Sequence, residues 1–188
     1  DSLYRVGDSG SGTYEVVFQG PLRSRFKLEY SQWALGDEQL HVSHQVQIVA
    51  GRLCYGNLVT YSGTDEALSL VPGIVNMHSD SLHVLELNEQ FTALLTHDRQ
   101  AEDGSWLCMA LVVPSTYLSS TGETADEGEG ITQTYYACLE ARPDESRSYR
   151  FYAFWEKEDP AWASLAEIEN YLQTEAERLS QSVIYNTQ

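Results

Sequence analysis

Hydrophobic and polar residues alternate along several stretches of this chain, most clearly over residues 21–30. One side of this segment carries Leu22, Ser24, Phe26, Leu28 and Tyr30. The other side carries Arg23, Arg25, Lys27 and Glu29. A period of two residues is typical of a strand with one buried face, so the pattern predicts a half-buried β-strand here.

The same alternation returns over residues 39–50, which predicts a second strand. Its apolar side carries Leu40, Val42, His44, Val46, Ile48 and Ala50. Its polar side carries His41, Ser43, Gln45 and Gln47. Gly51 and Arg52 then form an expected hairpin turn, and residues 53–61 return as a strand.

Further strand-like segments follow at 68–71, 74–78, 81–87, 91–97, 106–113, 131–141 and 147–156, after an earlier one at 13–19. Residues 106–113 are almost continuously apolar, so we expect a central strand that is covered on both faces. Residues 117–130 are small, polar and acidic, and they predict a mobile surface loop.

Helical spacing is convincing in one place, over residues 164–181. An apolar stripe that should lie on a sheet is formed by Leu165, Ile168, Tyr171 or Leu172, Ala176 and Leu179. Ser164 and Glu167 have the spacing of a capping box, which places the start of the helix.

These elements predict a mostly β fold with two packed antiparallel sheets and one C-terminal α-helix. A closed eight-stranded barrel followed by a helix, as in lipocalins, is the alternative. The length of 188 residues predicts one domain over residues 1–188. The chain begins at Asp1 without a leader segment, so we expect a mature form or an N-terminally truncated piece of a larger domain.

Charge changes the interpretation of residues 21–30. The chain has 11 Lys and Arg against 28 Asp and Glu, and its net charge is -17, yet Arg23, Arg25 and Lys27 share one face of one strand. Such a local cationic stripe attracts an anion such as a uronate carboxylate or a sulfate. The alternative is an ordinary solvated outer face, where Lys and Arg are common.

Two groups of histidines are candidates for chemistry. His41 lies on the polar side of its strand and is a candidate binding residue, whereas His44 lies on the apolar side and is expected to be a core histidine with a hydrogen-bonded nitrogen. His78 and Asp80 share a face if the strand at 74–78 continues, and a carboxylate beside an imidazole suits general acid or base catalysis. A loop in which Asp80 caps a turn is the alternative.

Aromatic residues are numerous, with 12 Tyr and four Trp. Tyr135 and Trp155 are candidates for a platform that stacks on a sugar ring, and the alternative is that they belong to an aromatic core. Cys54, Cys108 and Cys138 lack zinc-like spacing and are expected to be buried free thiols, or one disulfide and one spare thiol.

Several classes of function are disfavoured. The sequence pI of about 4.4 argues against nucleic acid, and no apolar run is long enough to span a membrane. Serine hydrolase and zinc peptidase motifs are absent. We expect no metal or other cofactor, although calcium is conceivable at Glu123, Asp126, Glu127 and Glu129, whose spacing does not match the helix-flanked calcium loop.

A series of short motifs resembles the domain-of-unknown-function family numbered 4861. They occur in order at residues 4–9, 20–26, 33, 71–78, 110–114 and 151–155. The resemblance implies a secreted or periplasmic bacterial protein tied to polysaccharide breakdown, with a β-sandwich like that of galactose mutarotases. Members of this family often accompany hydrolases that act on unsaturated uronides.

Three hypotheses for function follow. The first is a carbohydrate-active domain, a polysaccharide lyase or glycoside hydrolase, in which Arg23 and Arg25 bind a uronate and His78 with Asp80 acts as acid or base. His41, Tyr135 and Trp155 would complete the substrate site. The second is a non-catalytic glycan-binding accessory module, and the third is a lipocalin-like carrier of an apolar ligand.

Overall fold

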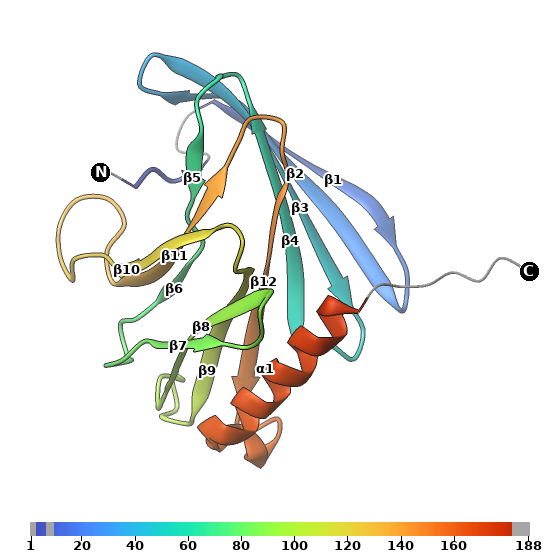
Figure 1. Ribbon diagram of the computed structural model, residues 1–188, viewed down its shortest axis with the longest axis vertical. Coiled ribbons are helices and arrows are strands. Elements are labelled where there is room, and N and C mark those ends of the chain that lie inside the picture. The colour runs from blue at the N-terminus through green and yellow to red at the C-terminus, as the bar shows by residue number, and fades with distance from the viewer. Residues whose placement is uncertain (1–2, 7–9, 182–188) are drawn as a thin grey trace, which may run out of the picture.

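The computed structural model describes residues 3–6 and 10–181 and shows two antiparallel sheets with one C-terminal α-helix (Figure 1). The first strands are β1 (Ser11–Gln19), β2 (Arg23–Leu35), β3 (Glu38–Val49), β4 (Cys54–Ser62), β5 (Leu68–Leu70) and β6 (Gly73–Val75). The later strands are β7 (His83–Glu86), β8 (Phe91–Asp98), β9 (Leu107–Pro114), β10 (Leu118–Glu123), β11 (Thr134–Ala141) and β12 (Arg147–Trp155). A 3-10 turn, η1 (Pro160–Ala163), leads into α1 (Leu165–Ser180).

The larger sheet has eight strands in the order β1-β2-β3-β4-β12-β9-β8-β7. The smaller sheet has the order β10-β11-β5, and β6 also pairs with β11. The predicted β-sandwich class is therefore confirmed. The barrel alternative is wrong, because β1 and β7 lie at opposite edges of an open sheet instead of pairing with each other.

The two faces of the large sheet are covered by different elements. On one face, residues of β8, β9 and β12 such as Leu95, Val112 and Phe154 pack against Ile168 and Leu172 of α1. The other face packs on the small sheet through two clusters of buried residues. One cluster joins Leu94, Leu111 and Val113 to Ile74, Ala137 and Leu139, and the other joins Trp33, Leu40, Val42, Val59 and Tyr61 to Ala141. The central strands are thus buried on both sides, as the apolar run at 106–113 predicted.

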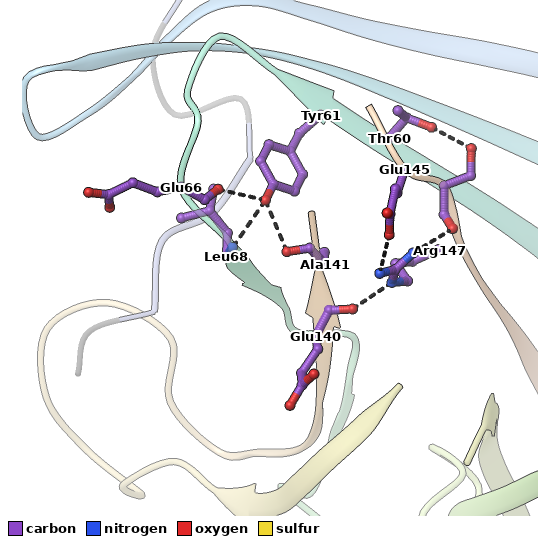
Figure 2. Close-up of polar contacts among 9 residues, drawn as sticks. Thr60, Tyr61, Glu66, Leu68, Glu140, Ala141, Glu145 and Arg147 are labelled. Atoms are coloured by element: carbon purple, nitrogen blue, oxygen red, sulfur yellow. Dashed lines mark hydrogen bonds and ion pairs between the residues drawn. The ribbon is translucent and has the colours of Figure 1, made fainter. Parts of the chain in front are cut away.

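A hydroxyl on β4 holds the two sheets together (Figure 2). The Tyr61 hydroxyl lies 3.0 Å from the carbonyl oxygen of Ala141 on β11 and 2.9 Å from that of Glu66, and it accepts a 3.0 Å hydrogen bond from the Leu68 amide. Nearby, Arg147 of β12 donates to the Glu140 carbonyl and pairs with the Glu145 carboxylate at 2.9 Å. Polar groups that the small sheet would otherwise bury without partners are satisfied in this way.

Three local expectations need correction. The strand expected at residues 21–30 begins at Arg23 and continues to Leu35, across an irregular register between Tyr30 and Trp33. The expected acidic loop begins instead with β10, because its small polar residues pair with β11. The helix occupies almost the predicted residues, but Ser164 makes no side-chain capping bond, so the capping box does not form.

The three cysteines, Cys54, Cys108 and Cys138, are free thiols. Cys108 is buried, and Cys54 and Cys138 are half-buried. Burial raises the pKa of the Cys108 thiol well above its usual value, so this group stays neutral at physiological pH. The expected free thiols are confirmed and the alternative with one disulfide is wrong, but only Cys108 is buried as expected.

Truncation of Leu172 to alanine should cost about 2–5 kcal/mol of stability, because this fully buried side chain of α1 fills the space over β9 and β12. Urea unfolding followed by circular dichroism measures the loss. The neighbouring exposed residue supplies the control, since Gln173→Ala should change stability by less than about 0.5 kcal/mol. Equal unfolding midpoints for the two variants would contradict this packing.

Replacement of Tyr61 by phenylalanine should cost about 1–3 kcal/mol, because it leaves the Leu68 amide and the Ala141 carbonyl without their partner. Tyr55→Phe is the matched control, since it removes the same hydroxyl from the same strand at a ring that is 38% exposed. Thermal unfolding of both variants tests the difference. A Tyr61→Phe protein as stable as Tyr55→Phe would show that the hydroxyl does not join the sheets.

Candidate functional site

The best candidate site lies on the face of the large sheet that α1 covers. Helix α1 packs over β8, β9 and β12 on this face, and the candidate site is on the neighbouring strands β2 and β3. Gln47 pairs with Gly56 and Gly56 pairs with Arg150, which lies on the same side of β12 as the helix-packed Tyr152. Because side chains alternate along strands, this face of β2 and β3 also carries the polar residues that the sequence predicted. We call it the polar sheet face, and it comprises Arg23, Arg25, Lys27, Glu29, His41, Ser43, Gln45 and Gln47.

Among the described residues, Arg23 and Arg25 are the cations of this face that no carboxylate neutralises. Their guanidinium carbons lie 4.6 and 5.6 Å from the ring centroid of Phe18 on β1. Arg25 also donates a 2.7 Å hydrogen bond to the Gln47 side-chain oxygen. Within the described ranges, neither arginine has an ion-pair partner, although the chain carries 28 acidic residues.

Glu29 is the centre of a polar cluster on the same face. Its carboxylate accepts a 2.9 Å hydrogen bond from the Ser43 hydroxyl and lies 2.9 Å from the Lys27 ammonium and 2.6 Å from His41 Nε2. Burial alone would raise the pKa of Glu29, but the hydrogen bonds from Lys27 and Ser43 and the nearby positive charge outweigh it, so the pKa is lowered. The carboxylate is therefore held in its charged form.

His41 lies between this carboxylate and a serine. Its Nδ1 is 3.2 Å from the Ser31 hydroxyl, and its Nε2 faces Glu29. Its side chain is 48% exposed, so a ligand on the polar sheet face can reach it. The other histidine of this strand points away, and His44 Nε2 is 2.8 Å from the Asn57 side-chain oxygen, as expected of a hydrogen-bonded core histidine.

His78 and Asp80 lie in a different part of the molecule. Strand β6 ends at Val75, and both residues follow it as exposed residues of a turn region. The expectation that they share a strand face is wrong, because the buried Asn76 leaves the strand and bonds the Glu123 carboxylate at 2.6 Å instead. The structure thus does not combine them with the cations of β2.

The two predicted aromatic residues are also separate from the cations. Tyr135 is buried on the inner side of β11, and burial raises the pKa of its hydroxyl. Trp155 is 41% exposed at the end of β12, where its indole N–H donates a 2.6 Å hydrogen bond to Ser105. Of the seven residues predicted for a site, only Arg23, Arg25 and His41 share one surface.

Sequence reasoning missed Phe18 and Ser31 as members of the site. Phe18 was hidden because β1 has its own register irregularity between Val16 and Phe18. Ser31 was hidden because the predicted strand ended at residue 30, whereas β2 continues to Leu35. Glu29 was recognised as part of the polar side, and its distance of two residues from Lys27 was the available signal for a shared ion pair.

Calcium finds no support in the acidic segment. Within residues 3–6 and 10–181, no three His, Cys, Asp or Glu side chains gather closely enough to hold a metal ion. One of the four candidate carboxylates, Glu123, is already bonded to the Asn76 amide.

An open antiparallel sheet with one polar face, covered elsewhere by a small sheet and a helix, defines a β-sandwich protein with a solvent-accessible candidate binding face. The chain belongs to the family described as a domain of unknown function, DUF4861, whose model matches residues 1–184. No curated protein sequence matches the chain. In the part of the chain that is described, no helix has both the length and the apolar character that a membrane span requires.

Glu29→Gln should lower the free energy of unfolding at neutral pH, where the carboxylate is ionised and paired. Because its folded pKa lies below its usual value of 4.5, this contribution is present above that pH and is lost as the pH falls through the lower folded value. Urea unfolding over a series of pH values measures it, with the exposed loop variant Glu127→Gln as control. A difference from wild type that is the same at acidic and neutral pH would contradict the pairing.

Proposed function

We propose that this protein binds acidic oligosaccharides, those containing uronate residues, through the polar sheet face. The observation that carries the proposal is the pair Arg23 and Arg25, two adjacent guanidinium groups without a carboxylate partner in the described chain, in a protein of net charge -17. In so acidic a chain, intramolecular carboxylates are abundant. A cationic pair left unneutralised is therefore available to an external anion.

The chemistry of the arginines favours a carboxylate. A guanidinium group presents its donors in a planar fork that matches the two oxygens of a carboxylate. The Phe18 ring supports both groups from one side and restricts their conformations, which reduces the entropy lost on binding. Arg25 is also oriented by Gln47, so at least one fork is already in position before a ligand arrives.

The rest of the polar sheet face suits sugar hydroxyl groups. Ser43, Gln45 and Gln47 lie along β3 at spacings of two residues, which places amide and hydroxyl groups about 7 Å apart on one side. Neutral donors and acceptors at such intervals fit the hydroxyl groups of successive sugar rings. The motifs shared with the family support the same class of ligand, since they imply a role in polysaccharide breakdown.

The proposed setting is the bacterial periplasm or the cell exterior, which the resemblance implies. Binding without catalysis, as in a glycan-binding accessory module, is the form that the arginine pair supports directly. The carrier of an apolar ligand is not proposed, because it depended on the closed barrel that the open sheet replaces.

Arg25→Gln should weaken the binding of oligogalacturonate by about 10- to 100-fold, since a hydrogen bond to a charged group contributes about 1.5–3 kcal/mol. Arg23→Gln should act in the same direction, and added salt should weaken binding to the wild type. Isothermal titration calorimetry measures the affinities. Arg99→Gln is the matched control, because Arg99 lies over Trp106 on the β8–β9 connection, away from the polar sheet face. This variant should bind oligogalacturonate as the wild type does.

Three results would contradict the proposal. One is the absence of heat with any uronate-containing oligomer. Another is equal affinity for the neutral sugar of the same linkage, because the arginine pair recognises charge. The third is an affinity lost equally in Arg99→Gln and Arg25→Gln, which would point to net charge and not to the polar sheet face.

A further inference from the structure

The irregularity in β2 lies beside Ser31 and His41. Tyr30 pairs with Val42 and Trp33 pairs with Leu40, so Ser31 and Gln32 together face the single residue His41. Gln32 has a φ of 56°, which a residue with a side chain adopts at a cost in energy. Gly10 packs so closely against this bulge that a Cβ there would lie within 3 Å of Gln32, which fixes the bulge from the other side.

The extra residue comes directly after this pair. The register up to Tyr30 and Val42 already places Ser31 opposite His41, and the Ser31 hydroxyl lies 3.2 Å from His41 Nδ1. Bulges are often found next to active sites. The strained residue, the serine and the histidine therefore occur at one position in the sheet.

The charge beside His41 favours one tautomer. Its Nε2 is 2.6 Å from Oε2 of Glu29, whose carboxylate is held ionised by Lys27 and Ser43, although this contact lacks the geometry of a hydrogen bond and leaves Oε2 without a hydrogen-bond partner among the described residues. The negative charge beside Nε2 favours the neutral imidazole that carries its proton on Nε2 and leaves a lone pair on Nδ1. That lone pair faces the Ser31 hydroxyl, which is the arrangement of a nucleophile, a general base and an orienting carboxylate.

We propose that Ser31 and His41 are catalytic residues for the hydrolysis of carboxylic esters, with Glu29 as a positioning residue. As Ser31 Oγ bonds to the acyl carbon, its proton passes to His41 Nδ1. The same proton then protonates the departing alcohol as the ester C–O bond breaks. Water next attacks the acyl-serine, gives a proton to His41, and Ser31 recovers it as the acid leaves. The net reaction is ester and water to acid and alcohol, without a redox step.

The substrate class rests on the proposed function. Arg25 and Ser31 lie on the same side of β2 and about 20 Å apart, so an oligomer of several sugar rings that lies along the strand from a uronate bound at Arg25 would reach Ser31. An acyl group carried on such a hydroxyl, for example an acetyl ester, is the class of substrate that this position favours. The histidine is half-exposed, which suits attack on a substituent of a long polymer.

The test uses p-nitrophenyl acetate, which needs no glycan binding, and acetylated oligogalacturonate, which does. Ser31→Ala should lower the release of p-nitrophenol and of acetate by at least about 100-fold. The matched control is Ser120→Ala, an exposed serine of β10, which should hydrolyse both esters as wild type does. A fluorophosphonate probe should label Ser31 of the wild type, as located by peptide mass spectrometry, and this result does not depend on whether any variant folds.

Glu29 is tested by the conservative replacement. Glu29→Gln should lower kcat by about 10²-fold or more with little change in KM, because it removes the group that orients His41. Glu29→Asp, which keeps the carboxylate, should recover part of kcat. A merely structural role would not give recovery in kcat alone.

The failures of the two proposals are distinguishable. No hydrolysis of either ester, or labelling of serines other than Ser31, would overturn the catalytic proposal. The binding of oligogalacturonate would still be tested separately by calorimetry. Hydrolysis of p-nitrophenyl acetate but not of the acetylated oligomer would overturn the glycan ester as substrate. Ser31→Ala should retain the wild-type affinity for deacetylated oligomer, which separates loss of chemistry from loss of binding.

Discussion

The burial of β9 and β12 on both faces is the constraint on which the rest of the structure depends. Tyr152 and Phe154 pack under α1, while Leu111 and Val113 pack against the small sheet. Because these strands lie between β4 and β8, they join the two halves of the large sheet into one layer. A fully buried apolar side chain contributes about 1.5–3 kcal/mol, so this centre supplies much of the free energy that orders the outer strands.

This central burial leaves the outer strands free to carry polar residues. Strands β2 and β3 contribute to the core on one side through residues such as Val42 and Leu40. Their other side needs no apolar residues, since α1 packs mainly over β8, β9 and β12. The polar sheet face can therefore hold arginines, a paired carboxylate and a histidine without loss of the core. The proposed binding site thus lies on the face of β2 and β3 where packing does not require apolar residues.

Sequence patterns predicted the parts of this structure that depend on local periodicity. The alternation around Arg25 and His41 placed these residues on the correct faces, since the period of a strand is a property of the backbone. The stripe containing Leu172 placed the helix for the same reason. What failed needed long-range information. The short polar residues of β10 carry no apolar alternation, because the strand lies at an edge of the small sheet and buries little.

The candidate site was predicted only in part, for a related reason. Arg23, Arg25 and His41 lie on one face because their strands are neighbours in the chain, whereas Tyr135 and Trp155 required knowledge of how distant strands pair. The extra residue near Ser31 is invisible to an alternating pattern, since it changes pairing and not composition.

Strand β1, which pairs with β2 on the other side, has a register irregularity of its own, and this irregularity has a further consequence. Strand β1 is an edge with exposed Tyr14, Val16 and Val17, and its own register irregularity interrupts the row of backbone donors and acceptors that a foreign strand would need. The irregularity thus discourages edge-to-edge aggregation at a strand with exposed apolar side chains.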